Sequence, residues 1–216
     1  MLAFNCDVMG YYETDVGMGK LAKLLLTVFV MGAIFWGMAL ISGEPYQGHV
    51  AEPVQVYLAN GQTMNILGET GYVELSLVAA YTVEGVVKGK KKYSDYPAQV
   101  SAYDLALAWG DLNKAEIDEL ISYSQSGRWY YYRYAPNNLV SKDYIATHSA
   151  NVHLIHRDQA VLNEIKRIGK NDHVRLEGYL VNVNFKDSPW RTSLSRADTG
   201  NGACEIIYVT NVNIID

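Results

Sequence analysis

Alternation of hydrophobic and polar residues is clearest between residues 72 and 87, where apolar side chains recur at nearly every second position. This period of two predicts a long β-strand with one face in a core. Similar patterns predict strands over residues 127–134, 173–185 and 204–215, and a shorter one over 54–58. The strand over 173–185 changes phase near Gly178, so we expect either a bulge there that re-aims the side chains or a strand whose two faces are both covered from that point on.

Signals for short helices separate these strands. Asp158 stands at the N-cap of a segment with one apolar face, Ser141 caps a second short helix, and Asn113 begins a third. Ser101 begins a sequence with the spacing of a capping box, and we therefore expect residues 104–110 to be a helix as well. Strands and short helices together predict an α+β domain.

An uncharged apolar stretch precedes the predicted sheet. Residues 24–41 contain eighteen residues without a charge or a proline, and a helix of that length spans about 27 Å, close to the ~30 Å core of a bilayer. We expect a transmembrane anchor, with a cleaved secretory signal as the alternative. Lys20 and Lys23 before the stretch, with no further Lys or Arg until Lys88, orient the C-terminal part away from the cytoplasm.

The expected organisation has four parts: a cytoplasmic tail at 1–23, a transmembrane anchor at 24–42, a linker at 43–70 and a globular domain at 71–216. The expected fold class is α+β, with an N-terminal transmembrane helix followed by a curved antiparallel sheet. We expect this sheet to close as an OB-like small β-barrel with three or four short helices. A half-open sheet with helices on one face is the alternative.

Composition narrows the classes of function. The chain has 17 tyrosines and 4 phenylalanines, which suits half-buried sheet surfaces. A net charge of −5 disfavours nucleic acid and acidic lipid as partners. Cys6 and Cys204 are too few for a disulfide framework or a zinc site, and the expected anchor would place them on opposite sides of a membrane.

The loop from Lys186 to Gly202 is the best candidate for a binding site. It has seventeen residues, and structureless loops of that length are uncommon unless they are functional or disordered. Arg191 and Arg196 offer planar donors to a carboxylate or phosphate, and Trp190 offers a stacking surface. The alternative is structural: an Arg196–Asp198 pair holds the loop while Trp190 covers one end of the barrel.

Other candidate residues lie outside this loop. His148, His153 and His156 fall within nine positions, but their spacing matches no metalloprotease helix, and we expect neither a metal nor a cofactor. His148 and Asn151 are candidate binding residues at a turn. Trp129 belongs to an aromatic strand that could stack on sugars or bases.

A catalytic interpretation pairs Cys204, or a serine of the loop, with His148 as nucleophile and base. Glu205 next to Cys204 opposes thiolate formation, and no GxSxG elbow is present. We therefore expect a binding or structural module rather than an enzyme. A separation above about 6 Å between the Cys204 sulfur and every imidazole nitrogen would exclude the hydrolase.

Three segments resemble an uncharacterised family of bacterial membrane-anchored proteins: YDLALAWGDL, HSANVHLI and SLSRADTGNGACEIIYV. The resemblance covers about residues 70–215 and implies a bacterial inner-membrane setting, but no activity. The combined expectation is a single-pass protein with a periplasmic domain that binds a protein partner or an envelope polymer. An oligonucleotide-binding OB domain is a further alternative, which needs a basic groove.

Overall fold

The computed structural model describes residues 19–41, 45–59, 61–69, 71–135, 139–186, 188–198 and 202–215. The chain divides into two compact units, Met1–Glu44 and Pro45–Asp216. In the first unit the described part is helix α1 (Lys20–Ile41), where the Thr27 hydroxyl donates to the Lys23 carbonyl oxygen at 2.9 Å.

The predicted transmembrane anchor at 24–42 is wrong. Across the residues that the structure describes, no helix combines the length and the apolar character needed to cross a membrane. The helix begins at Lys20, so Lys20 and Lys23 belong to its first turn instead of flanking an apolar segment. The single-pass inner-membrane location and the periplasmic orientation depended on this anchor, and they are withdrawn with it.

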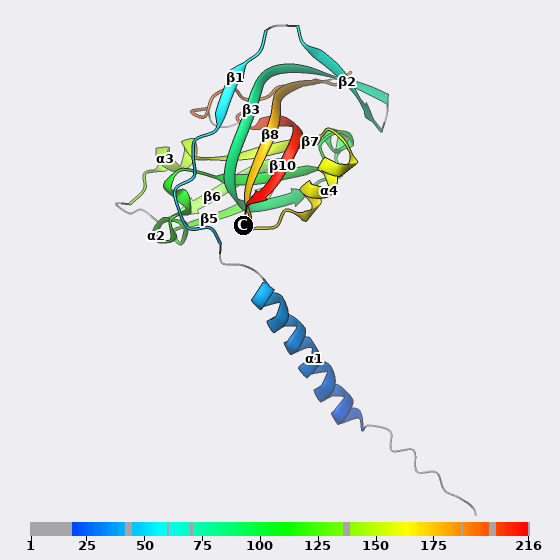
Figure 1. Ribbon diagram of the computed structural model, residues 1–216, viewed down its shortest axis with the longest axis vertical. Helices are drawn as coiled ribbons and strands as arrows, with labels where there is room; N and C mark the ends of the chain where they lie inside the picture. The colour runs from blue at the N-terminus through cyan, green and yellow to red at the C-terminus, as the bar shows by residue number, and fades with distance from the viewer. Residues whose placement is uncertain are drawn as a thin grey trace, which may run out of the picture. The chain divides into compact units, whose positions relative to one another are not determined.

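The second unit is mostly β-sheet with short helices (Figure 1). Its strands are β1 (Val54–Tyr57), β2 (Thr63–Gly68), β3 (Gly71–Lys92), β4 (Tyr103–Ala108), β5 (Ile121–Ser126), β6 (Trp129–Tyr134), β7 (Ser149–His156), β8 (His173–Asn184), β9 (Pro189–Trp190) and β10 (Glu205–Ile215). Its α-helices are α2 (Ala115–Asp118), α3 (Lys142–Thr147) and α4 (Gln159–Arg167), and 3-10 turns occur at Tyr96–Gln99 and Asp111–Asn113.

Five strands pair into a closed ring in the order β3, β4, β7, β10, β8 and back to β3. The β7–β10 pairing is parallel, and the other four pairings are antiparallel. Five strands in a ring are also the architecture of an OB-type barrel, a likeness of fold that implies no function. The unit is therefore α+β and mostly sheet, without the transmembrane helix that the expected fold class included.

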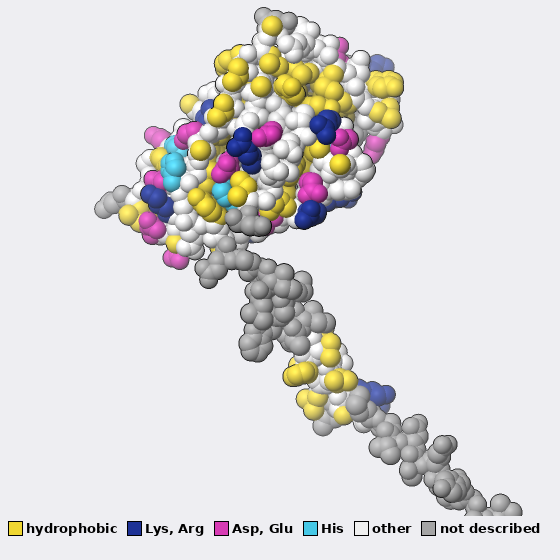
Figure 2. Space-filling view, viewed as in Figure 1, with side chains coloured by type: hydrophobic (Ala, Val, Ile, Leu, Met, Phe, Trp, Pro, Cys, Tyr) yellow, Lys and Arg dark blue, Asp and Glu magenta, His cyan; other side chains and the backbone are white. Residues whose placement is uncertain are grey.

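Three strands extend the sheet outside the ring. β1 and β2 both pair with β3, so the range 43–70, expected to be a linker, contributes two strands to the sheet. β9 pairs with β8. The outward side chains of β1 are apolar, with Val54 and Val56 about 60% exposed, and hydrophobic side chains gather on this face of the unit (Figure 2).

The inside of the ring is a hydrophobic core. Leu105, Val152 and Ile207 come from three different strands and are fully buried in one cluster. Helix α4 adds apolar residues to the same cluster, and it begins as predicted, because the Asp158 side chain accepts a hydrogen bond from the Val161 amide at 3.0 Å.

The predicted helix at 104–110 is wrong, because residues 103–108 form strand β4. Leu105 and Leu107 point into the ring, while Ala106 and Ala108 are also buried on the opposite face. The β5–β6 hairpin and the neighbouring elements cover that outer face. A strand buried on both faces reads as a continuous apolar run and loses its period of two.

Candidate binding site at the end of the ring

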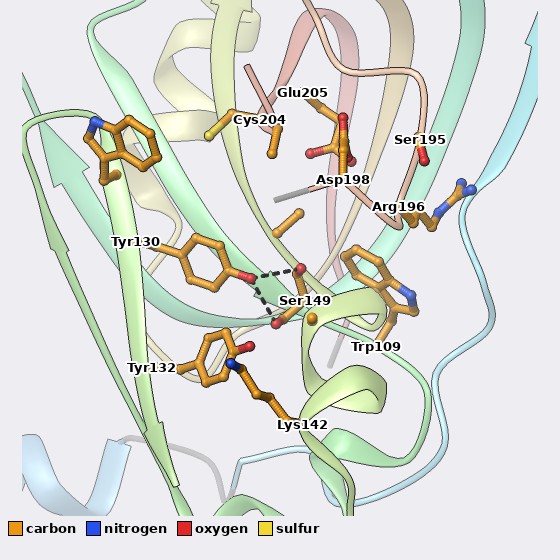
Figure 3. Close-up of a pocket in the computed structure, with 14 residues that line it drawn as sticks. Trp109, Tyr130, Tyr132, Lys142, Ser149, Ser195, Arg196, Asp198, Cys204 and Glu205 are labelled. Carbon is orange, nitrogen blue, oxygen red and sulfur yellow. Dashed lines mark hydrogen bonds between the residues drawn. The ribbon is translucent and has the colours of Figure 1, made fainter. Parts of the chain in front are cut away.

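A cavity of about 280 Å³ lies where β4 ends and where β7 and β10 begin (Figure 3). These three ends meet because β7 runs parallel to β10 and antiparallel to β4. The β5–β6 hairpin, α3 and the loop before β10 complete the walls. Fourteen residues line the cavity: Trp109, Trp129, Tyr130, Tyr132, Lys142, Ala146, Ser149, Ala150, Ser195, Arg196, Asp198, Ala203, Cys204 and Glu205.

Aromatic side chains form much of the wall and are held by hydrogen bonds. The Tyr130 hydroxyl donates to the Ser149 carbonyl oxygen at 3.0 Å. Trp109 follows β4 and is 1% exposed, and its Nε1 donates to Glu52 Oε2 at 3.1 Å. In Figure 3, Tyr130 and Trp109 lie on opposite sides of the cavity. The Tyr130 hydroxyl and the Trp109 Nε1 already have hydrogen-bond partners, so these rings offer mainly apolar surface to the cavity.

Glu205 is a buried acidic residue in the wall of the cavity. As the first residue of β10, it has the same side-chain parity as Ile207 and Val209, which face the core of the ring. Its side chain is buried, and its Oε2 has no hydrogen-bond partner among the described residues. Burial raises the pKa of this carboxyl to about 8, an effect that nearby Arg196 opposes.

Arg196 lies on the same side of the cavity. Its Nη2 donates to the Pro53 carbonyl oxygen at 2.9 Å, whereas its buried Nε has no partner within the described parts of the chain. The predicted Arg196–Asp198 lock is not among the ion pairs of the described residues. Asp198 Oδ2 instead lies 2.7 Å from Ser193 Oγ.

The loop before β10 is anchored to that strand at two points. The Ser193 amide donates to the Cys204 carbonyl oxygen at 3.0 Å, and the Ile206 amide donates to Thr192 Oγ1 at 3.0 Å. Ser193 Oγ also accepts from the Ser195 amide at 3.1 Å. These bonds join the stretch that leads to Arg196 to the start of β10.

Of the seven predicted binding residues, Trp129, Arg196 and Asp198 line the cavity. Trp190 and Arg191 do not. Trp190 packs on the outside of the ring, with its centroid 4.6 Å from that of His153, and Arg191 Nη1 donates to Asn184 Oδ1 at 2.8 Å.

His148 and Asn151, the remaining two, support the walls from behind. His148 Nε2 lies 2.8 Å from Glu52 Oε1, on the same carboxylate that holds Trp109. Asn151 is buried, accepts from Gln125 Nε2 at 2.7 Å, and donates to the Arg128 carbonyl oxygen at 3.2 Å. Asn151 thereby joins Gln125 and Arg128 of the hairpin to β7.

A buried ionic network, which the sequence analysis missed, fixes the hairpin more firmly. Asp104 is fully buried on β4; its Oδ1 lies 2.9 Å from Arg128 Nη1 and its Oδ2 lies 2.9 Å from His153 Nδ1. Arg128 also pairs with Asp95 at 2.6 Å and lies over the Tyr93 ring at 4.3 Å. Removing one partner of such a network leaves an uncompensated buried charge, so the loss of Asp104 or Arg128 would disturb the hairpin wall.

The geometry does not favour a cysteine hydrolase. Burial, and then the charge of Glu205, raises the pKa of the Cys204 thiol to about 12, so it is protonated at neutral pH and a poor nucleophile. His148, the proposed base, is engaged at both ring nitrogens, by Glu52 and by the Tyr144 carbonyl oxygen at 2.9 Å. Cys6 lies outside the described residues.

Several lining residues escaped the sequence analysis. Glu205 was considered only as a neighbour of Cys204, although an acidic residue directly before the apolar run IIYV, with inward parity, was an available signal. Trp109 and Tyr130 were assigned to a helix and to a general aromatic strand. Lys142 carried no signal, because its place in the cavity depends on how α3 packs.

No protein-family model, no curated protein and no solved structure matches this chain. The resemblance to a bacterial family therefore remains a prediction.

Proposed function

We propose that this protein is a non-catalytic binding module whose ligand occupies the cavity at the start of β7 and β10. The observation that carries the proposal is the buried Glu205 carboxyl, which lines the cavity with one oxygen unpartnered among the described residues. Buried polar groups in folded proteins are nearly always hydrogen-bonded, and an exception requires an explanation. We infer that a ligand in the cavity supplies the missing partner once the Glu205 side chain turns toward it, because Oε2 is itself buried.

The lining supports the same conclusion. Ligand pockets are concave and mostly apolar, with a few polar groups that fix orientation. This cavity has an aromatic wall and a polar side with Arg196, Asp198 and Glu205. Its volume of about 280 Å³ suits a small molecule, one side chain of a protein partner, or one unit of a polymer.

The chemistry of the side chains favours binding over catalysis. The Cys204 thiol has a raised pKa of about 12, and the Ser193 hydroxyl contacts Asp198 and a carbonyl oxygen, with no histidine beside it in the described structure. A nucleophile needs an adjacent base or a lowered pKa. Cys204 has neither, and Ser193, which has the Asp198 carboxylate beside it, does not line the cavity, so the lining favours binding over catalysis.

The proposal is tested by screening the full chain against a fluorinated fragment library with ligand-observed NMR. Ala146 lines the cavity from α3, and Ala146→Trp should fill it. The matched control is Ala160→Trp on the exposed surface of α4. We expect fragments that bind the wild type and Ala160→Trp and lose at least tenfold in affinity with Ala146→Trp. Equal binding by all three proteins, or no binding by any, would contradict the proposal.

A further inference from the structure

The surface that the cavity offers to a ligand indicates the class of that ligand, an inference that rests on the proposed function. We propose that the cavity binds an uncharged, largely apolar ring of the size of benzene or indole, with at most one hydrogen-bonding group. The ring belongs either to a free small molecule or to a side chain of a peptide.

Several polar atoms of the lining already have hydrogen-bond partners within the protein. The Tyr130 hydroxyl and the Trp109 Nε1 are bonded as described above. Ser149 Oγ donates to the Ile145 carbonyl oxygen at 2.7 Å, and Ser195 Oγ accepts from a backbone amide at 3.1 Å. A ligand with many polar groups would lose its hydrogen bonds to water and find few replacements, and each group left unpaired weakens binding. The lining therefore disfavours sugars and other polyhydroxy compounds.

The charged residues of the lining do not offer an inner site for an ion. The Glu205 carboxyl is buried, and burial raises its pKa to about 8, so it is largely uncharged at neutral pH. Arg196 Nη2 donates to a backbone carbonyl oxygen at 2.9 Å, and in Figure 3 its guanidinium points away from Tyr130. Lys142 and Asp198 are exposed residues, where an ion pair with a ligand contributes little. A charged ligand would therefore lose its solvation without gaining a buried ionic partner.

The remaining surface of the cavity consists mainly of aromatic rings and methyl groups. Tyr130 and Trp109 lie on opposite sides of the space in Figure 3, and Trp129 lines the same cavity while being 39% exposed. Methyl groups complete this surface, from Ala146, Ala150 and Ala203. Such a lining binds a flat apolar ring by burying its surface and by stacked or edge-to-face contacts. A volume of about 280 Å³ is at the small end of ligand pockets, which favours a single or fused ring over a larger compound.

The first experiment compares probes of similar size that differ in charge or polarity. Benzyl alcohol, benzoate and benzylamine share one aromatic ring and are neutral, negative and positive at neutral pH, whereas glucose is a neutral ring covered with hydroxyls. Ligand-observed NMR on the full chain gives the dissociation constants. We expect benzyl alcohol to bind at least about fivefold more tightly than each of the others. Benzoate, benzylamine or glucose binding within fivefold of benzyl alcohol, or more tightly, overturns the apolar class and leaves the proposed function standing.

A further probe distinguishes the two sources of the ring. N-acetylphenylalaninamide carries the ring on an uncharged peptide backbone. Binding tighter than that of benzyl alcohol assigns the cavity to an aromatic side chain of a peptide, and weaker binding assigns it to a free small molecule.

The two proposals can fail separately. If none of these probes binds while fragments still bind in a manner blocked by Ala146→Trp, the apolar class is wrong and the binding function holds. If fragments also fail, the proposed function is wrong as well.

The second experiment tests the contacts with variants. Trp129→Ala should weaken the binding of benzyl alcohol about tenfold, in line with the value of one aromatic contact. Tyr131→Ala is the matched control, since Tyr131 is 53% exposed on the same strand and does not line the cavity. Lys142→Met removes a charge from the lining and should change the affinity by less than about threefold. Equal losses in Trp129→Ala and Tyr131→Ala, or a larger change in Lys142→Met, would contradict binding through apolar contacts.

Discussion

Glu205 places a carboxyl where a strand of the core begins, and its surroundings keep that carboxyl largely protonated at neutral pH. Burial is the main cause of the raised pKa of about 8, and Asp198 adds to it. A protonated carboxyl can donate one hydrogen bond and accept others. At the scale of this residue, the site is therefore sensitive to pH in the range where proteins usually work.

This pKa leads to a prediction about stability. The unfolded carboxyl has its usual pKa of 4.5, so the folded state holds an extra proton between about pH 4.5 and 8. The stability contributed by this proton is fully present below about pH 4.5 and is lost as the pH rises through about 8. As the pH rises, the wild type should therefore lose unfolding free energy relative to Glu205→Gln, by at most about 1.4 kcal/mol per pH unit.

Urea unfolding of both proteins at half-unit steps from pH 4 to 9 measures this difference. Groups common to both proteins cancel in the comparison. Glu116→Gln, at an exposed position on α2, is the control and should follow the wild type. A constant difference across the whole range would contradict a raised pKa at Glu205.

Gly178 lies on β8 between two strands that each contain a bulge. The register shifts at Val78 in β3 and at Thr210 in β10, the two strands on either side of it. A Cβ at Gly178 would collide with the Tyr208 carbonyl oxygen of β10.

Within β8 the period of two continues through Gly178, because Leu176 and Leu180 both face the core of the ring. Val181 and Val183 are buried on the outside of the ring. The change of phase in the sequence arises because both faces of β8 are covered beyond Gly178, and the extra residues of the bulges lie in the neighbouring strands.

Gly178→Ala should destabilise the protein by at least about 3 kcal/mol, because two backbones would have to separate to admit the methyl group. The control is Gly169→Ala, where the new Cβ would meet only the Asp172 side chain, at 3.6 Å. Chemical denaturation measures both. A loss below about 1 kcal/mol in Gly178→Ala would show that β10 can move aside.

The sequence marked the position of Gly178 and missed Glu205 for a physical reason. The end of the simple apolar–polar alternation is visible along one strand, so the point beyond which both faces are covered can be read locally. The burial of Glu205 depends on Trp109 and Arg196, which come from distant parts of the chain. No local pattern records those contacts.

At the scale of elements, two of the four predicted helix starts are confirmed, at Ser141 and Asp158. Ser101 is followed by strand β4, and the N-cap of α2 is Lys114 instead of Asn113. Ser141 accepts from the Tyr144 amide at 3.1 Å at the start of α3, as its sequence predicted. The helix expected from Asn113 is reduced to the single turn α2, because Ile121 starts β5 instead. A cap acts within one turn of its helix. The hydrophobic residues around Ile121 can form a helix or a strand, depending on what they pack against in the folded protein.

The C-terminal end of helix α4 is hydrogen-bonded to a lysine of strand β3. Lys90 Nζ on β3 donates to the carbonyl oxygens of Ile165, Lys166 and Ile168, at 2.7, 2.9 and 2.7 Å. The last carbonyl groups of a helix have no partner within the helix. This lysine therefore acts as the C-terminal cap of α4 from another element.

Lys90→Met should retain most of the side-chain packing and lose all three hydrogen bonds, which we expect to cost about 1–3 kcal/mol of stability. Hydrogen exchange should show the loss first in α4. The control is Lys91→Met, on the neighbouring exposed residue, which should change stability by less than about 0.5 kcal/mol. Unchanged exchange in α4 would contradict the capping role.

At the scale of the whole molecule, the α+β class could be predicted, because the strands over 72–87 and 173–185 show their period. The membrane anchor could not be established by counting uncharged residues over 24–41 alone, and the structure corrects it. The order of strands in the ring was also beyond the sequence, since pairing between distant segments leaves no local pattern.

The place of β10 has a consequence for how the protein is made. This strand, Glu205–Ile215, sits between β7 and β8, which come before it in the chain. While a ribosome is still adding residues before 205, β7 and β8 each present an unpaired edge, and such edges promote association with other chains. Nascent copies on one messenger RNA should therefore be most prone to aggregate after β8 has emerged from the ribosome and before β10 has, and protection by a chaperone would matter most at that moment.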